Sequence, residues 1–321
     1  MVRSRCHFLG LLFLITTTLP TCGPGSKPGP ETKATLKPLG LIFESVIEGE
    51  ILYRPLMQPR GLTSDNAGNL YVIDAGNNRL VKFDRKLQAV REAGGFGSAD
   101  GLLNAPTHIT VDNGLSLYVS DAGNQRIAVY DTRLNFGYSI SLTDIEDPLK
   151  YGRPAGLAVN EYGEVLVADR DNSRLVVFNS FGNFDRFIGG VESSAGRLLM
   201  PSGLCLGPEA EILACDLGNS RIEIFDALGI YDTHFGDRYL GEPSGIGLDP
   251  AGNIWVVDRN PAGLYCFDRS GAVLFSIART GASDAFDLGQ PYDLAFLPDD
   301  RIVVSDSGND RLLIYRILYP E

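Results

Sequence analysis

Short runs of consecutive apolar residues recur along most of the chain, each bounded by Gly, Asn, Asp or Pro. Leu70–Ile73 and Ile254–Val257 are typical of these runs, in which Val, Ile, Leu and Tyr predominate. Runs of about four to six such residues between turn residues predict β-strands joined by hairpins. Because the apolar positions are consecutive and not alternating, we expect both faces of each small sheet to be buried.

The runs form one unit that is repeated six times. Each unit opens with a proline and a first strand, passes through a turn into a second strand that ends in aspartate, and then reaches a third strand. The opening residues are Pro59, Pro106, Pro154, Pro201, Pro243 and Pro291, and the aspartates are Asp74, Asp121, Asp169, Asp216, Asp258 and Asp306. Small sheets that bury both faces can pack against copies of themselves around a ring. We therefore predict an all-β, six-bladed β-propeller with four strands in each blade.

The last unit stops after its third strand, near Tyr319. Residues 41–47 precede the first unit and are similar to the fourth strands expected at residues 184–188 and 230–235. We expect this N-terminal strand to complete the sixth blade. The ring would then be closed by hydrogen bonds between the two ends of one domain, residues 41–321.

A D-x-x-N-x-R element follows the second strand in five of the six units. The copies are Asp74/Asn77/Arg79, Asp121/Asn124/Arg126, Asp169/Asn172/Arg174, Asp216/Asn219/Arg221 and Asp306/Asn309/Arg311. This element resembles the NHL-repeat family of six-bladed β-propellers, and the similarity extends over nearly all of residues 41–319. The fifth unit departs from the pattern, because Asp258 is followed by Arg259-Asn260-Pro261.

The repeated element is interpreted as structural, because a catalytic pair would not be needed five times. We expect each aspartate to accept a hydrogen bond from the backbone N–H two residues later and to pair with the arginine. We expect the Asn or Gly of the turn to adopt the left-handed conformation.

The first 21 residues are typical of an export signal. Arg3 and Arg5 give a positive start, and the apolar stretch Phe8–Ile15 is too short to span a bilayer. Residues 19–22 resemble a bacterial lipobox, although Thr21 replaces the usual Gly or Ala, and this resemblance implies lipidation of Cys22. Residues 22–40 are rich in Gly and Pro and predict a flexible tether. We expect an exported lipoprotein, periplasmic or anchored in the outer membrane by its lipid alone, or a secreted protein if Cys22 is not modified.

Charge argues against nucleic acid as a partner. The chain has 40 Asp and Glu against 28 Lys and Arg, for a net charge of −12, and the predicted signal removes two further positive charges. Nucleic-acid binding requires clustered Lys and Arg that neutralise phosphates. No such cluster is found in the sequence.

The propeller region contains three cysteines, Cys205, Cys215 and Cys266. Cys205 and Cys215 are expected on neighbouring strands of one hairpin. They could form a disulfide in an oxidising compartment, or remain free as small buried apolar residues. The sequence leaves both alternatives open.

Few residues of the sequence fit a catalytic or metal site. Motifs for nucleophilic catalysis or phosphate binding are absent, and only His108 and His234 lie beyond the signal, so three histidines cannot bind zinc. No cofactor is expected, although calcium stays possible because similar propellers include calcium-dependent lactonases. Asp293 is the one carboxylate at the repeated position nearest the axis.

The third residue of each unit suggests a binding site. It is glycine in four units, as expected where inner strands crowd around the axis, but it is His108 in the second and Asp293 in the sixth. With Arg60 and Tyr292, one position earlier in their units, these residues predict a pocket for an anionic or hydrogen-bonding group. If the two side chains lie close together, Asp293 would favour the protonated form of His108. Alternatively, His108 and Asp293 bond only to each other or to backbone.

These features favour a monomeric binding scaffold for a protein, peptide or glycan of the cell envelope. Propellers usually bind partners on loops at one rim. The longer loops here are residues 94–105, 144–153, 189–200 and 279–290, with Phe96, Tyr151 and Phe286 among their side chains. The alternative is a metal-assisted lyase or lactonase with its site on the axis.

Overall fold

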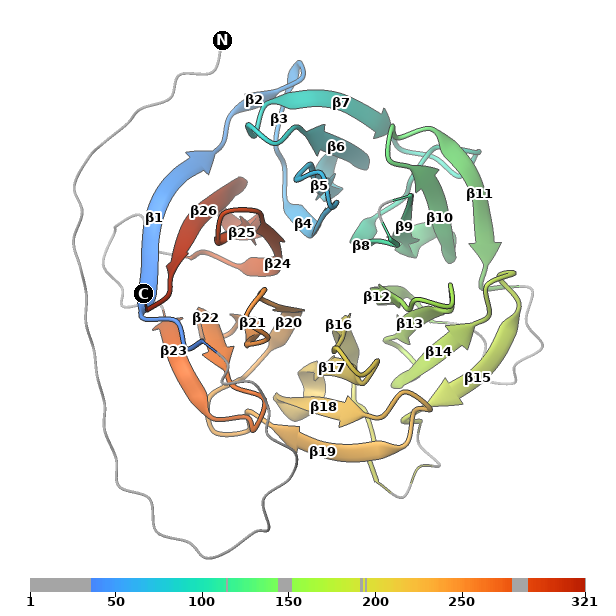
Figure 1. Ribbon diagram of the computed structural model, residues 1–321. Coiled ribbons are helices and arrows are strands. Elements are labelled where there is room, and N and C mark those ends of the chain that lie inside the picture. The colour runs from blue at the N-terminus through green and yellow to red at the C-terminus, as the bar shows by residue number, and fades with distance from the viewer. Residues whose placement is uncertain are drawn as a thin grey trace, which may run out of the picture.

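The computed structural model describes residues 36–113, 115–143, 152–190, 193, 195–278 and 288–320. These residues form six four-stranded antiparallel sheets, arranged as blades around a central axis (Figure 1). The first strand of each unit lies innermost, and later strands follow outward. The predicted all-β, six-bladed propeller is confirmed.

The blades have the following strands. Blade one contains β4 (Pro59–Ser64), β5 (Leu70–Asp74), β6 (Arg79–Phe83) and β7 (Ala89–Gly94), and blade two β8 (Pro106–Val111), β9 (Ser116–Asp121), β10 (Arg126–Asp131) and β11 (Phe136–Ser141). Blade three contains β12 (Pro154–Val159), β13 (Val165–Asp169), β14 (Arg174–Phe178) and β15 (Phe184–Ile188), and blade four β16 (Pro201–Leu206), β17 (Ile212–Asp216), β18 (Arg221–Phe225) and β19 (Tyr231–Phe235). Blade five contains β20 (Pro243–Leu248), β21 (Ile254–Arg259), β22 (Ala262–Phe267) and β23 (Val273–Ala278).

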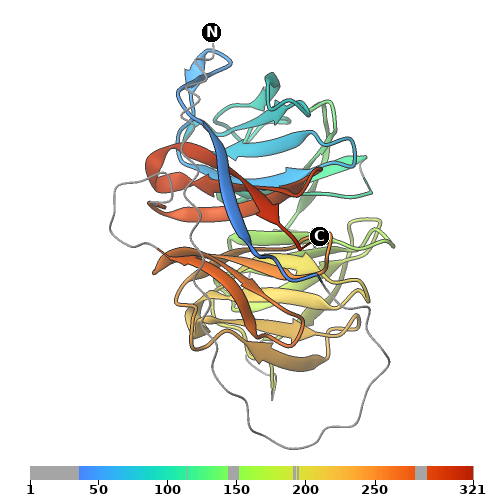
Figure 2. The same ribbon diagram turned by 60° about the vertical axis from the view of Figure 1, so that its left-hand side comes forward.

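Blade six is assembled from both ends of the described chain. It contains β24 (Pro291–Leu297), β25 (Arg301–Asp306), β26 (Arg311–Leu318) and β1 (Gly40–Ile47). β1 pairs antiparallel with β26, from Gly40 opposite Leu318 to Ile47 opposite Leu312. Figure 2 shows β1 lying along β26 at the outer side of the ring. The predicted closure is confirmed, with the strand beginning one residue earlier than expected.

Smaller elements connect the blades and turns. A two-stranded hairpin of β2 (Glu50–Ile51) and β3 (Arg54–Pro55) precedes blade one. Short 3-10 turns follow four of the second strands: η1 (Ala75–Asn77), η2 (Ala122–Asn124), η3 (Leu217–Asn219) and η4 (Ser307–Asn309). Each of these turns contains the middle of a D-x-x-N-x-R element.

The core lies between neighbouring blades. All four apolar residues of β5, Leu70–Ile73, are 0% exposed, although they point alternately to opposite faces of the sheet. Leu70 and Val72 pack with Val303 and Leu312 of blade six, whereas Tyr71 and Ile73 join a cluster with blade two. Consecutive apolar residues therefore bury both faces of the blade, as predicted.

The cysteines are free. Cys205 on β16 lies opposite Leu213 on β17, and neither Cys205, Cys215 nor Cys266 forms a disulfide. Cys205 and Cys215 instead pack in the apolar cluster between blades four and five. The structure therefore has the second of the two alternatives, in which the cysteines are free and pack as small apolar residues.

The N-terminal predictions fall on residues that the structure does not describe. The expected signal at 1–21, Cys22 and most of the tether at 22–40 lie outside the described residues, as do Tyr151 and Phe286. Within residues 36–320, as far as they are described, no helix is long and apolar enough to cross a membrane.

Candidate functional site

Each repeated aspartate joins the end of its second strand to the loop that enters its blade. Its carboxylate accepts a hydrogen bond of 2.7–3.0 Å from a backbone N–H that lies 17 residues earlier in the sequence. The six donors are Met57, Asn104, Gly152, Leu199, Gly241 and Gly289. A buried carboxylate thus fixes the start of every inner strand.

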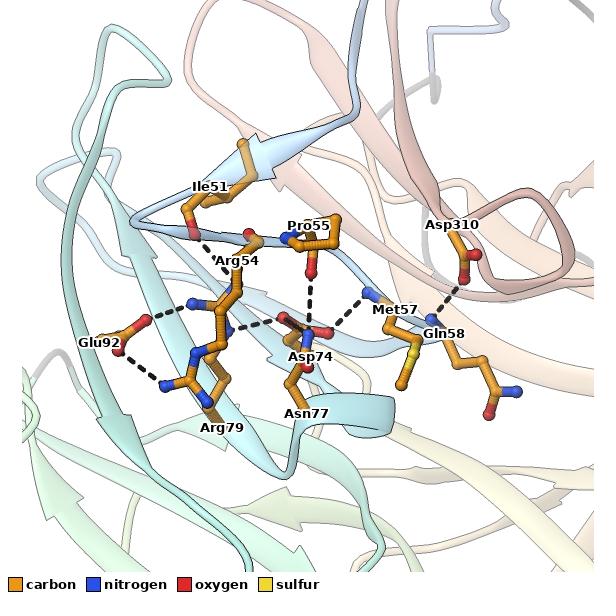
Figure 3. Close-up of polar contacts among 10 residues, drawn as sticks. All are labelled: Ile51, Arg54, Pro55, Met57, Gln58, Asp74, Asn77, Arg79, Glu92 and Asp310. Atoms are coloured by element: carbon orange, nitrogen blue, oxygen red, sulfur yellow. Dashed lines mark hydrogen bonds and ion pairs between the residues drawn. The ribbon is translucent and has the colours of Figure 1, made fainter.

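Blade one shows the complete network (Figure 3). Arg79 donates through Nε to Asp74 at 2.7 Å, forms an ion pair with Glu92, and donates to the backbone carbonyls of Ile51 and Arg54 at 3.0 and 3.1 Å. Asn77 donates at 2.8 Å to Oδ2 of Asp74, the same oxygen that accepts from Arg79, whereas Oδ1 accepts from the Met57 N–H. Arg79 is 1% exposed, so its guanidinium is buried, and all of the contacts named above are with residues that hold the fold together.

Two details of the repeated turns differ from the sequence-based expectation. The backbone donor lies 17 residues before the aspartate, and only Asp258 also accepts from the N–H two residues later, that of Asn260 at 2.8 Å. The left-handed residue is the one that follows the motif asparagine. These residues are Asn78, Gln125, Ser173, Ser220 and Asp310. The arginine bonds its aspartate at 2.7–3.0 Å in four blades, whereas Arg221 stays 3.8 Å from Asp216.

His108 occupies the axis. It is 4% exposed, and neither ring nitrogen has a hydrogen-bond partner among the described residues. Burial lowers its pKa to about 4, the Ser244 backbone raises the pKa in part, and the charges of Arg60 and Arg170 lower it further. His108 is therefore neutral near pH 7, and Asp293 is not among the groups that shift its pKa, so the proximity on which a protonated His108 depended is not found.

Asp293 is also buried, but its carboxylate is already engaged. Oδ2 accepts from the Leu62 N–H at 3.0 Å and Oδ1 from the Leu294 N–H at 2.9 Å. Burial nevertheless raises its pKa to about 7, against the opposing effect of these two bonds. Asp293 therefore joins blade six to blade one and makes no bond to His108. For Asp293, the structure has the alternative in which the carboxylate bonds to backbone groups.

Arginines surround Tyr292 at the same end of the axis. The Cζ atoms of Arg60 and Arg259 lie 5.4 and 5.8 Å from the centre of its ring, and the His108 ring centre lies at 5.2 Å. Burial raises the pKa of Tyr292, and the charges of Arg60, Arg170 and Arg259 lower it in part. We call these five residues the axial arginine mouth.

The three arginines of the mouth have no acidic partner among the described residues. They are half-buried, none of them forms an ion pair there, and the buried Nε of Arg170 has no hydrogen-bond partner. Arg60 lies on β4, Arg259 ends β21, and Arg170 directly follows β13. Three unpaired guanidinium groups beside a neutral imidazole form a site suited to an anion.

Sequence reasoning identified Arg60, His108 and Tyr292 but missed Arg170 and Arg259. Both directly follow the repeated aspartate of their units. The other four units have small or apolar residues at this position: Ala75, Ala122, Leu217 and Ser307. The comparison between units that identified His108 would have found the two arginines as well.

The mouth does not fit a calcium ion. In the described part of the chain, no group of three or more His, Cys, Asp or Glu residues could hold a metal. Both oxygens of Asp293 are occupied by backbone donors, and the nearby guanidinium charges oppose a cation. His234, the other histidine beyond the predicted signal, lies on the outermost strand β19.

Comparisons with known proteins agree with this architecture. The NHL repeat model matches residues 56–83 and 151–178, which correspond to blades one and three. No curated protein sequence gives a significant match.

Solved structures with the same fold have low sequence identity. A virginiamycin B lyase from Staphylococcus aureus has a TM-score of 0.60 at 14% identity, covering 85% of this chain and 88% of its own. A gluconolactonase from Xanthomonas campestris has 0.63 at 16%, covering 81% and 86%. The calcium-binding regucalcin from Agrobacterium tumefaciens has 0.59 at 12%, covering 82% and 91%. At these identities the likeness shows the fold alone. The chain is therefore a six-bladed β-propeller that contains NHL repeats in blades one and three.

Proposed function

We propose that this propeller is a binding scaffold whose axial arginine mouth receives an anionic group of its partner. The observation that carries the proposal is the set of three half-buried arginines without an acidic partner among the described residues. Guanidinium groups bind carboxylates and phosphates through paired, charge-assisted hydrogen bonds. An anion between Arg60, Arg170 and Arg259 would supply the acceptors that these side chains lack.

The rim around the mouth supports a larger partner than a free ion. Phe96, Leu199, Met200 and Tyr239 belong to loops that enter the blades, and they are 75%, 45%, 39% and 50% exposed. Exposed aromatic and apolar side chains beside a charged pocket are typical of protein and peptide recognition. We therefore propose a protein, peptide or glycan that inserts an acidic group into the mouth and packs on these loops.

Anion binding can be measured directly with citrate and pyrophosphate, by calorimetric titration of the purified protein at low salt. The triple variant Arg60→Gln, Arg170→Gln and Arg259→Gln should bind the better of the two anions at least about tenfold more weakly, which corresponds to about 1.4 kcal/mol. Arg133→Gln is the matched control, because it removes an exposed arginine from an outer turn. Equal affinity of the triple variant and wild type, or no binding of either anion, would contradict the proposal.

Envelope attachment is proposed from Cys22 and the Gly- and Pro-rich residues after it. Cys22→Ala should move the protein from the membrane to the soluble fraction of its native cells. Lipidation contributes about 0.8 kcal/mol of membrane binding for each buried methylene group, so loss of the acyl chain has a large effect. If the variant stays in the membrane fraction, the lipoprotein assignment is wrong.

A lyase or lactonase is the second candidate, because propellers with these names share the fold. His108 is the residue of this chain that such an activity would use first, since its neutral ring faces the mouth without a partner. Glucono-δ-lactone hydrolysis, measured with and without added calcium, separates the two functions. Turnover by wild type that is lost in His108→Gln would favour the enzyme over the scaffold.

A further inference from the structure

A cavity lies on the propeller axis beyond His108, and it is separate from the axial arginine mouth. Its volume is about 350 Å³, and all six inner strands line it. The lining begins at the third or later residue of each inner strand, whereas Arg60 and Tyr292 are second residues and lie outside the lining. The inner strands run side by side around the axis (Figure 1), so the cavity lies toward their C-terminal ends. His108 belongs to both regions and separates them.

Apolar side chains are the most numerous in the cavity lining, but the surface that faces the cavity is more polar than apolar, and no Lys or Arg lines it. Leu206, Phe296 and Val159 represent its apolar part, and the hydroxyls of Thr63 and Thr110 are its polar part. Among the described residues neither threonine donates a hydrogen bond through its side chain. Asp293 is the one acidic residue of the lining, and its two oxygens accept backbone N–H groups. The cavity is thus a poor environment for an ion and is suited to an uncharged molecule that has both apolar and hydrogen-bonding parts.

His108 gives this cavity a specific polar group. A neutral imidazole has one N–H donor and one bare nitrogen acceptor, and neither nitrogen of His108 has a well-aligned hydrogen bond to a described residue, with the Ser244 backbone close enough to raise its pKa and the side chain 4% exposed. A buried polar group without a partner costs free energy, because it has lost its hydrogen bonds to water. A molecule in the cavity that reaches the imidazole with a donor or a hydroxyl would remove this cost.

We infer that the cavity is a second binding site, for an uncharged small molecule that has an apolar part and a hydrogen-bonding group for His108. Its volume lies in the range of about 300–1,000 Å³ that small-molecule pockets have. This inference does not depend on the proposed anion site, because the two sites have opposite chemistry and different linings. Their only common residue is His108.

N-phenyl-1-naphthylamine is a suitable probe, since it is uncharged, aromatic, carries one N–H donor, and fluoresces when it leaves water. Wild type should enhance its fluorescence in a saturable titration near neutral pH. Thr110→Trp fills the cavity from β8 and should weaken binding at least about tenfold. The control is Thr233→Trp, which makes the same change at an exposed position of β19 and should bind as wild type does.

Further variants keep the test decisive. If Thr110→Trp is not folded by circular dichroism, Thr63→Phe fills the same cavity from β4. His108→Phe keeps a ring but removes both nitrogens, and it should weaken the probe several-fold. Citrate binding at the mouth should be unchanged in Thr110→Trp, so failure of one site is distinguishable from failure of the other. A wild type that gives no saturable enhancement, or cavity-filling variants that bind as well as Thr233→Trp, would overturn the inference.

Discussion

The ring of repeated turns and the axis differ in how their polar groups are satisfied. In the turns, every repeated aspartate has a backbone donor from the loop that enters its blade, and Arg79 uses its guanidinium entirely on structural partners. On the axis, His108 has no partner, and the mouth arginines have no acidic partner among the described residues. Both regions use residues of the same strands and turns, only a few positions apart in the sequence.

The difference distinguishes residues that stabilise the fold from residues that we propose to bind a ligand. Polar groups that are buried and fully bonded hold a fold together, whereas buried groups left without partners cost free energy and persist in native proteins for a reason. The repeated aspartate occurs once in each blade, and its asparagine and arginine partners occur in five of the six blades. The unrepeated residues break the symmetry at blades one, two, three, five and six. We therefore expect substitutions in the two regions to have effects of different kinds.

The largest loss of stability is expected from removing β1, the strand that completes blade six. Deleting residues 40–47 removes β1, its hydrogen bonds to β26 and the burial of Leu41 and Phe43 against blade six. The loss should be several kcal/mol in the free energy of unfolding. Chemical denaturation measures it, with Val46→Thr as a control that keeps the strand and changes one partly exposed side chain. An unchanged denaturation midpoint would show that β1 does not close the ring.

A smaller loss of stability is expected when one repeated turn loses its arginine. Arg79→Gln leaves Asp74 as a buried carboxylate without its cation and should cost about 3–5 kcal/mol. Arg153→Gln removes a comparable bond pattern at the surface, where the side chains of Arg153 and Asp171 are 69% and 41% exposed, and should cost no more than about 1 kcal/mol. If the two variants lose equal stability in urea, the structural interpretation of the buried turns is not supported.

The sequence predicts repeated features better than contacts between distant segments. Apolar runs, the opening prolines and the turn aspartates recur six times, so blade number and closure by residues 41–47 can be read from it. The bond from Met57 to Asp74 could not be read, because it depends on the path of the entering loop. The charge state of His108 could not be read either, because its burial, and not its neighbours in sequence, has the largest effect on its pKa. The cavity depends on how six inner strands pack, which no single unit specifies.

The pH dependence of stability, through Asp293 and His108 on the axis, gives a further test. Because burial raises the pKa of Asp293 to about 7, the folded state binds this proton more tightly than the unfolded state, and the contribution to stability is lost as pH rises toward 7. His108 has the opposite sign, since its pKa is lowered to about 4 and its contribution is lost as pH falls from about 6.5 toward 4.

Asp293→Asn should therefore gain stability relative to wild type as pH rises from about 5 to about 8, by up to about 3 kcal/mol. Denaturation midpoints of the two proteins across this range measure the change. Asp232→Asn, at an exposed position of β19, is the control and should show no such trend. A constant difference between Asp293→Asn and wild type would mean that Asp293 titrates alike in the folded and unfolded states.

The smallest effect on stability is expected where binding is proposed. Arg60, Arg170 and Arg259 carry like charges around one tyrosine, and no ion pair among the described residues offsets their repulsion. Replacing all three by Gln should keep the free energy of unfolding within about 1 kcal/mol of wild type, with any gain largest at low salt because ions screen the repulsion. Urea denaturation at low and high salt checks both statements. A loss as large as that of Arg79→Gln would place the three arginines with the structural turns and end the distinction between the two regions.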